Sequence, residues 1–442
     1  MTGFVFHDPS GRRAKRAGLY GGLVLAFITV LVAGFAATLA LAPRLPNLSL
    51  KDPRVLQALH RENAKHLKGK PAWTQVPRPP PHTAAAAKPL TVGFYVSWDE
   101  HSRESLQQHL NELDVVAPQW LALKGSTGEV SIIEDPRANA LITSAAKPPA
   151  VLPLIHNSSN AVWNGPEADK LLADPKARQA LIDNLVNLAK TRGYAGYMFD
   201  LEELSPASLR VYPAFLAQAR AALKPLGREV WVTAMFDREG WPLEKMQAVT
   251  DTLVLMAYDE HYGTGDPGPV AGQDWYQKYL AQSFKTLDPS RTVLALGAYG
   301  YDWTATKGKA TGAAQATTFH EAMVNALDSG SDVSFDEASL NPFYAYKDDA
   351  GRDHEVWFLD ASSAFNQVKV SDPWHPRGYG LWRMGSEDPG IWSVLGKPYG
   401  QAKADGLAVI APNEAVDFDG TGEVLKVTAT PSQGRRSNVF DP

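Results

Sequence analysis

The chain has 442 residues, and 44% of them are hydrophobic, a fraction that excludes a disordered or fibrous protein. Its formal net charge is −5, so the chain as a whole has no basic excess and nucleic acid is not an expected partner. It contains no cysteine, which excludes disulfides, thiolate metal sites and cysteine nucleophiles.

An uncharged segment covers residues 17–42. At about 1.5 Å per residue it is long enough to cross a hydrocarbon core of roughly 30 Å. The positive-inside bias predicts a single transmembrane helix over 17–42 in the inner (cytoplasmic) membrane, with a basic tail over 1–16 in the cytoplasm and the rest in the periplasm or outside the cell. A cleaved signal peptide ending at Ala42 is the alternative, although Pro43 would then follow the cut. The basic residues before the segment are Arg12, Arg13, Lys15 and Arg16.

Residues 43–89 are expected to connect this helix to a folded domain. Asp52 is a suitable N-cap for a juxtamembrane helix over 52–67, and Pro53 suits the first helical position. Residues 71–89 are rich in proline and alanine, which is typical of a semi-rigid spacer.

Short apolar runs alternate with amphipathic stretches from Leu90 onward. Residues 174–193 and 208–227 carry apolar side chains at helical spacing. Runs that alternate with helices predict parallel strands buried on both faces, and eight runs predict an α/β fold, a (β/α)8 TIM barrel over 90–398. An open doubly wound sheet is the alternative, but no glycine-rich phosphate loop follows the first run. The runs cover residues 90–98, 113–123, 149–157, 195–202, 229–236, 251–258, 291–299 and 377–384.

The separation of the seventh and eighth runs is too long for one helix. It contains a helical pattern over 317–330 and a hairpin pattern over 343–360 with a turn at Asp348–Gly351. We therefore expect a small α+β insertion that forms one wall of a cleft. Residues 399–442 are expected to form a β-rich C-terminal connector.

Two carboxylates stand at the end of the fourth run. With a strand period of two, Asp200 and Glu202 share a face with Met198, whereas Phe199 and Leu201 share the other. In a barrel the carboxyl ends of the strands hold the active site, so both carboxylates would face the mouth of the barrel. Like charge and burial would raise the pKa of one of them and suit it to general acid catalysis. A strand end already in solvent is the alternative interpretation.

These residues resemble the signature of glycoside hydrolase family 18, the chitinase family, whose fourth strand ends in D-x-x-D-x-D-x-E. The last aspartate and the glutamate of that signature match Asp200 and Glu202, whereas Ala195 and Met198 stand at its first two aspartate positions. Residues 256–259 (MAYD) resemble the family's M-x-Y-D at the sixth strand. The eighth run carries a tryptophan in GLW (380–382), where the family has the tryptophan that forms the floor of the substrate site.

The resemblance implies a role for each matching residue. Family 18 enzymes use the 2-acetamido oxygen of the substrate as the nucleophile, so Glu202 would be the general acid and base. Asp200 would stabilise the oxazolinium charge, and Tyr258 would hydrogen-bond the acetamido carbonyl. No metal and no cofactor are expected. The substrate-binding residues would be Asp259, Trp382, Tyr95, Trp98 and Met256.

The sequence thus predicts a membrane-anchored glycosidase of the chitinase type that acts on an N-acetylglucosamine-containing glycan. Because Ala195 and Met198 replace motif aspartates, a non-catalytic glycan-binding barrel is the alternative. The N-terminal segments and residues 416–436 also resemble the N-terminal part of bacterial fusion proteins. Those proteins continue with polysaccharide deacetylase and family 2 glycosyltransferase domains, so the resemblance implies such domains or partners here.

Overall fold

The structure, a computed structural model, describes residues 88–159, 162–237, 240–403, 414–419 and 426–431. Within these ranges no helix combines the length and the apolar character that crossing a bilayer requires. The predicted transmembrane helix over 17–42 and the predicted juxtamembrane helix over 52–67 lie outside the described residues.

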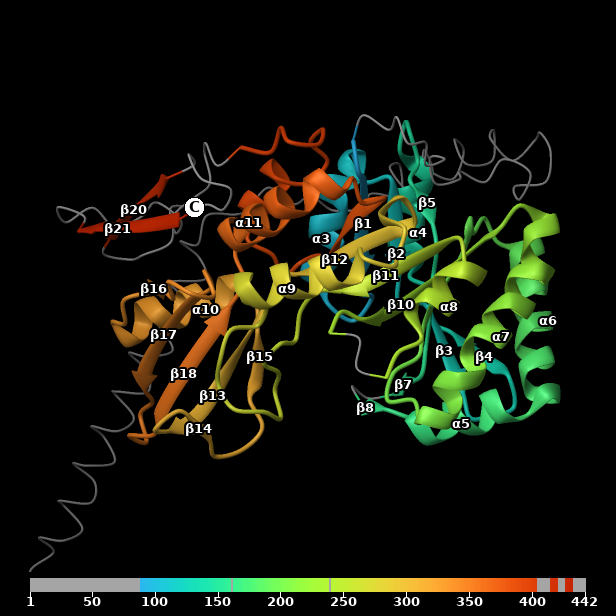
Figure 1. Ribbon diagram of the computed structural model, residues 1–442, viewed down its shortest axis with the longest axis horizontal. Helices are drawn as coiled ribbons and strands as arrows, with labels where there is room; N and C mark the ends of the chain where they lie inside the picture. The colour runs from blue at the N-terminus through green and yellow to red at the C-terminus, as the bar shows by residue number, and fades with distance from the viewer. Residues whose placement is uncertain (1–87, 160–161, 238–239, 404–413, 420–425, 432–442) are drawn as a thin grey trace, which may run out of the picture. The chain divides into compact units, whose positions relative to one another are not determined.

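A curled sheet of parallel strands forms the centre of the folded domain (Figure 1). Each of the apolar runs in the sequence contains at least one of its strands, because these runs are buried on both faces of the sheet. The parallel strands are β1 (Leu90–Tyr95), β2 (Val115–Pro118), β3 (Leu121–Lys124), β5 (Ala150–Val151), β6 (Leu154–His156), β9 (Gly196–Asp200), β10 (Glu229–Met235), β11 (Thr252–Met256), β12 (Thr292–Gly297) and β19 (Gly378–Trp382).

The strand pairings follow the order of the sequence. β1 pairs with β2 and with β19, and β9, β10, β11, β12 and β19 each pair with the next. The second and third runs are each split into two strands, so β2 pairs with β5, whereas β3 pairs with β6. β6 in turn pairs with β9, and this pairing connects β3 and β6 to the remaining strands of the sheet. This arrangement is consistent with the predicted TIM barrel. The short β4 (Glu129–Ile132) adds to β3 in antiparallel direction.

The two faces of each strand pack into two separate apolar clusters. In β9, Met198 belongs to the inner cluster, together with Val92 and Trp231 from other strands. Phe199 belongs to the outer cluster, where its ring meets Phe215 edge-on at 5.4 Å between ring centroids. Burial of each such side chain contributes roughly 1.5–3 kcal/mol to stability. The alternation confirms the expected orientation of the fourth strand, with Met198 inward and Phe199 outward.

Helices follow the strands and cover their outer face (Figure 1). Asp174 caps α6 and Ser205 caps α7, and a proline follows each cap, so α7 begins before the predicted start at residue 208. These helices are α3 (Glu100–His109), α4 (Pro136–Ser144), α5 (Gly165–Ala173), α6 (Pro175–Thr191), α7 (Pro206–Leu223), α8 (Leu243–Val249), α9 (Gln273–Ser283) and α11 (Ala361–Ser371).

An α+β insertion separates β12 from β19, as expected. Its helix is stabilised by a capping box in which Thr318 and Glu321 satisfy each other's backbone N–H groups. Residues Asp348 and Gly351 form the turn between two of its strands. The elements are β13 (Gly300–Thr306), β14 (Lys309–Ala310), β15 (Gln315–Thr317), α10 (Phe319–Ser329), β16 (Ser334–Phe335), β17 (Pro342–Lys347) and β18 (Asp353–Phe358).

Two small hairpins complete the described chain. β7 (Ser158–Ser159) and β8 (Val162–Trp163) pair directly after β6. In the C-terminal segment, β20 (Glu414–Asp419) and β21 (Lys426–Pro431) form an antiparallel pair.

Candidate active site

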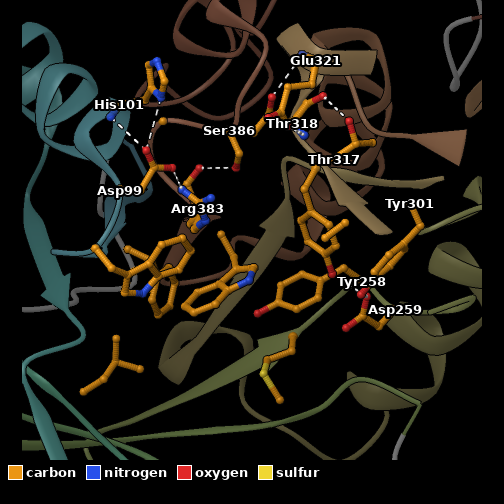
Figure 2. A pocket seen from close by; sticks show the side chains of 18 of the residues that line it. Asp99, His101, Tyr258, Asp259, Tyr301, Thr317, Thr318, Glu321, Arg383 and Ser386 are labelled. Atoms are coloured by element: carbon orange, nitrogen blue, oxygen red, sulfur yellow. Dashed lines mark hydrogen bonds and ion pairs between the residues drawn. The ribbon is translucent and has the colours of Figure 1, made fainter. Parts of the chain in front are cut away.

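A cavity of about 790 Å³ opens at the carboxyl ends of the parallel strands. The barrel contributes Asp200, Glu202 and Trp382 to its lining, and the insertion contributes Thr317 and Glu321. Figure 2 shows Thr317 and Tyr301 of the insertion on the side away from Asp99, next to Tyr258 and Asp259 of the barrel. The insertion therefore forms one wall of the site, as the sequence indicated.

Asp200 is the last residue of β9, and its side chain is almost fully buried on the inner face. The hydroxyl group of Thr233 on β10 donates to Asp200 Oδ1 at 2.7 Å. The same hydroxyl lies 3.2 Å from the backbone oxygen of Phe199. Met198, one step deeper in the strand, has no exposed surface and offers no hydrogen bond. Thr233 therefore provides the polar contact that Met198 cannot provide to Asp200.

The two carboxyl groups have unequal proton affinities. Burial raises the pKa of Asp200 to about 6, and the Thr233 hydrogen bond opposes this rise. Burial raises the pKa of Glu202 well above its ordinary value, and the negative charges of Asp200 and Asp259 raise it further. Burial and the neighbouring negative charges thus favour the protonated form of Glu202, whereas the Thr233 hydrogen bond favours the ionised form of Asp200. This is the division that a charge-stabilising group and a general acid require.

A second pair of site residues lies at the end of β11. Tyr258 is buried and Asp259 is partly exposed, and both line the cavity. Asp259 Oδ1 accepts hydrogen bonds from the hydroxyl groups of Tyr299 and Tyr301, the latter at 3.0 Å (Figure 2). The φ angle of Asp259 is 62°, a left-handed conformation that costs a non-glycine residue about 1–3 kcal/mol. The surrounding contacts thus hold Asp259 in a conformation that the backbone alone disfavours.

Aromatic side chains form much of the remaining surface. Trp382 is the last residue of β19, and its ring contacts the Phe94 ring edge-on at 5.5 Å between centroids. Trp98 has 66% of its surface exposed, and the guanidinium group of Arg383 lies 4.5 Å from its ring centroid. Arg383 is also paired with Asp99. Tryptophan faces of this kind can stack on the apolar faces of sugar rings.

The structure places seven of the eight predicted site residues in the lining of the cavity. They are Glu202, Asp200, Tyr258, Asp259, Trp382, Trp98 and Met256.

Tyr95 is the exception, which corrects the sequence analysis. It faces the helices, has no exposed surface, and its hydroxyl group donates to Asp135 Oδ2 at 2.6 Å. Because neighbouring strand residues face opposite sides, its neighbour Phe94 lines the cavity instead.

Several further residues of the site were not predicted from the sequence. Thr233 carried a weak signal, because it is a polar residue within the apolar run at 229–236. No sequence pattern marked Thr317 and Glu321, because they reach the cavity only through the tertiary fold of the insertion.

Comparisons with known proteins agree with this geometry. The profile described as Glycosyl hydrolases family 18 matches residues 90–387. The uncharacterized glycosylase YvbX of Bacillus subtilis (strain 168) is 25% identical over 324 residues, which cover 71% of this chain and 92% of YvbX. The cortical fragment-lytic enzyme of the same organism is 25% identical over 283 residues, 62% of this chain. The match covers 65% of that enzyme, just under two thirds of its length.

A solved structure shows the same fold. The chitinase from Chromobacterium violaceum ATCC 12472 superimposes with a TM-score of 0.62 at 22% identity. The superposition covers 69% of this chain and 96% of the chitinase.

Proposed function

Because the chain belongs to glycosyl hydrolases family 18, we propose that it hydrolyses an N-acetylglucosamine-containing polysaccharide by substrate-assisted catalysis with retention of configuration. One observation carries this proposal. Asp200, Glu202 and Tyr258 line the same cavity as the aromatic ring of Trp382, and burial together with the neighbouring negative charges raises the pKa of Glu202, which favours its protonated form.

In the first step, the protonated carboxyl group of Glu202 gives its proton to the glycosidic oxygen as the bond to the anomeric carbon breaks. The acetamido oxygen of the same sugar forms a new bond to that carbon, which yields a positively charged oxazolinium ring. The ionised carboxylate of Asp200 stabilises this charge, and the Tyr258 hydroxyl group donates to the acetamido oxygen.

In the second step, the carboxylate of Glu202 takes a proton from a water molecule. The water oxygen attacks the anomeric carbon, the bond to the acetamido oxygen breaks, and Glu202 is protonated again. Two inversions at one carbon give net retention. Trp382 would support the apolar face of this sugar, and Asp259 would bind a neighbouring hydroxyl or amide group.

We also propose that the protein is anchored in the inner membrane through 17–42, with the barrel in the periplasm or outside the cell. The uncharged length of that segment and the basic residues before it support this topology. The resemblance to bacterial fusion proteins supports cooperation with a polysaccharide deacetylase and a family 2 glycosyltransferase.

A glycan-binding barrel without turnover is the second candidate, because apolar Met198 and Ala195 are fully buried where the family signature has aspartates. Turnover of N-acetylglucosamine oligomers by the parent and by Glu202→Gln separates the two functions. We expect the amide to lower kcat about 10²–10⁴-fold while oligomer binding is retained. Binding without turnover in both proteins would favour the second candidate, and equal turnover in both would remove Glu202 from the acid role.

A further inference from the structure

The side chain of Asn157 holds the backbone of Glu202 by two hydrogen bonds. Asn157 Oδ1 accepts from the Glu202 backbone N–H at 2.9 Å, and Asn157 Nδ2 donates to the Glu202 backbone oxygen at 2.9 Å. Asn157 is 4% exposed, so these bonds are shielded from competing water. A single amide therefore satisfies both polar backbone groups of the residue proposed as the general acid.

The position of Asn157 explains why Glu202 needs this partner. The pairing of β6 with β9 ends at His156 and Asp200, so Glu202 lies beyond the strand ladder. Glu203 follows with a left-handed φ of 55°, which turns the chain sharply away. Without Asn157, the backbone groups of Glu202 would lose the partners that fix the chain between the end of the strand and this turn.

The same residue also connects the acid to another wall of the cavity. The backbone oxygen of Asn157 accepts from the Asn164 N–H at 2.9 Å, which closes the base of the β7–β8 hairpin. Trp163 on this hairpin lines the cavity. Asn157 thus joins the segment that carries Glu202 to a segment that faces the substrate.

From this geometry we infer that Asn157 is a positioning residue that fixes the carboxyl group of Glu202 through its backbone. The consequence for catalysis rests on the proposed function, in which Glu202 transfers the proton. A displacement of a catalytic group by about 1 Å can reduce the rate about 10²-fold. Asn157 itself transfers no proton.

Asn157→Ala in the full chain removes both hydrogen bonds. We expect kcat on N-acetylglucosamine oligomers to fall about 10–100-fold with little change in KM, because binding surfaces remain while the acid is displaced. We also expect the pKa of Glu202 to fall towards its ordinary value as its carboxyl group gains contact with water. Carbon-13 NMR of labelled glutamate side chains, assigned with Glu202→Gln, measures this pKa without turnover.

Asn157→Asp gives a conditional rescue. A protonated aspartic acid can accept from the Glu202 N–H and donate to the Glu202 oxygen, whereas the ionised form has no proton to donate. The kcat of Asn157→Asp relative to the parent should therefore rise as the pH falls. A role limited to stability would not produce this pH-dependent ratio, because folded protein is compared at each pH.

Asn341 provides a matched control in the same chain. Its side-chain amide also binds both backbone groups of one residue, Ala271, at 3.1 Å and 2.9 Å, and it is 1% exposed. Asn341 does not line the cavity. Asn341→Ala and Asn157→Ala should both lower thermal stability, but Asn341→Ala should leave kcat and the pKa of Glu202 at their parental values.

The outcomes separate this inference from the proposed function. A lowered Glu202 pKa in Asn157→Ala supports the positioning role even if the parent hydrolyses none of the oligomers, and in that case the proposed function fails. An active parent whose kcat and Glu202 pKa are the same in Asn157→Ala would overturn the inference. If Asn157→Ala does not fold, the pH-dependent ratio of Asn157→Asp decides, and a ratio that does not change with pH overturns it.

Discussion

Thr233→Val tests whether one hydroxyl group keeps Asp200 ionised in a buried position. The Thr233 hydroxyl donates to Asp200 Oδ1 at 2.7 Å, and valine removes this donor while nearly keeping the shape of the side chain. A hydrogen bond to a charged group contributes about 1.5–3 kcal/mol, and one pKa unit corresponds to about 1.4 kcal/mol. The pKa of Asp200 should therefore rise by about one to two pKa units above its value of about 6.

The sign of the effect on activity follows from the mechanism. Substrate-assisted catalysis needs Asp200 ionised, so the acidic limb of the pH–rate profile reports its proton affinity. Because Thr233→Val raises the pKa, the acidic limb should move to higher pH. At pH values below the acidic limb, the kcat/KM of Thr233→Val should be about 10–100-fold lower than that of the parent. Because the hydroxyl also lies 3.2 Å from the Phe199 oxygen, part of its donation is shared, which favours the lower end of this range.

The assay is the pH dependence of kcat/KM on N-acetylglucosamine oligomers. Thr233→Ser keeps the hydroxyl group and should keep the acidic limb near that of the parent. Thr250→Val is a control for loss of a buried threonine hydroxyl elsewhere, since the Thr250 hydroxyl donates to the Met246 backbone oxygen and Thr250 does not line the cavity. An acidic limb that is the same in Thr233→Val and in Thr233→Ser would refute the reasoning that Thr233 stabilises the ionised Asp200.

Three further expectations concern stability and location. Met198→Asp should lower Tm, because Met198 packs beside Trp231 in the inner cluster and a buried carboxyl group without partners costs several kcal/mol; an unchanged Tm with faster hydrolysis would contradict this. Burial raises the pKa of Asp360 to about 7, so the folded protein keeps a proton that the unfolded chain loses, and this contribution to stability declines between about pH 4 and pH 7. Asp360→Asn keeps the acceptor for the Ser363 N–H, and its Tm advantage over the parent should be larger at pH 8 than at pH 5 in calorimetry; an equal difference would contradict the raised pKa. A reporter fused after Lys88 that requires export should be active, and activity of a cytoplasmic reporter at the same position would exclude the proposed topology.

The orientation of the fourth strand could be predicted from the sequence, but that of the first could not. At the end of β9, the carboxylates of Asp200 in the strand and Glu202 just beyond it mark the face that meets solvent and substrate. The run LTVGFYVSW is apolar at both alternating positions, because both faces of the strand are buried. Its pattern therefore does not indicate which side faces the lumen, and Tyr95 was placed on the wrong side.

The supporting residues of the site were beyond sequence reasoning for a different reason. Thr233 reaches Asp200 because Val232 pairs with Phe199 in register. Asn157 reaches Glu202 because the pairing of β6 with β9 ends at His156, one residue before Asn157. Both contacts depend on how two strands align, which the spacing of residues within one strand does not determine.

The direct connection between β12 and the insertion limits how this protein can be recombined. β12 ends at Gly297 and β13 begins at Gly300; Tyr299 in the short connection and Tyr301 in β13 both bind Asp259. An insertion taken from another protein must therefore be joined after Tyr301 if Asp259 is to keep both phenol partners. The parts of the insertion after Tyr301 that do not line the cavity can then vary in length or sequence while the contacts of Asp259 stay the same.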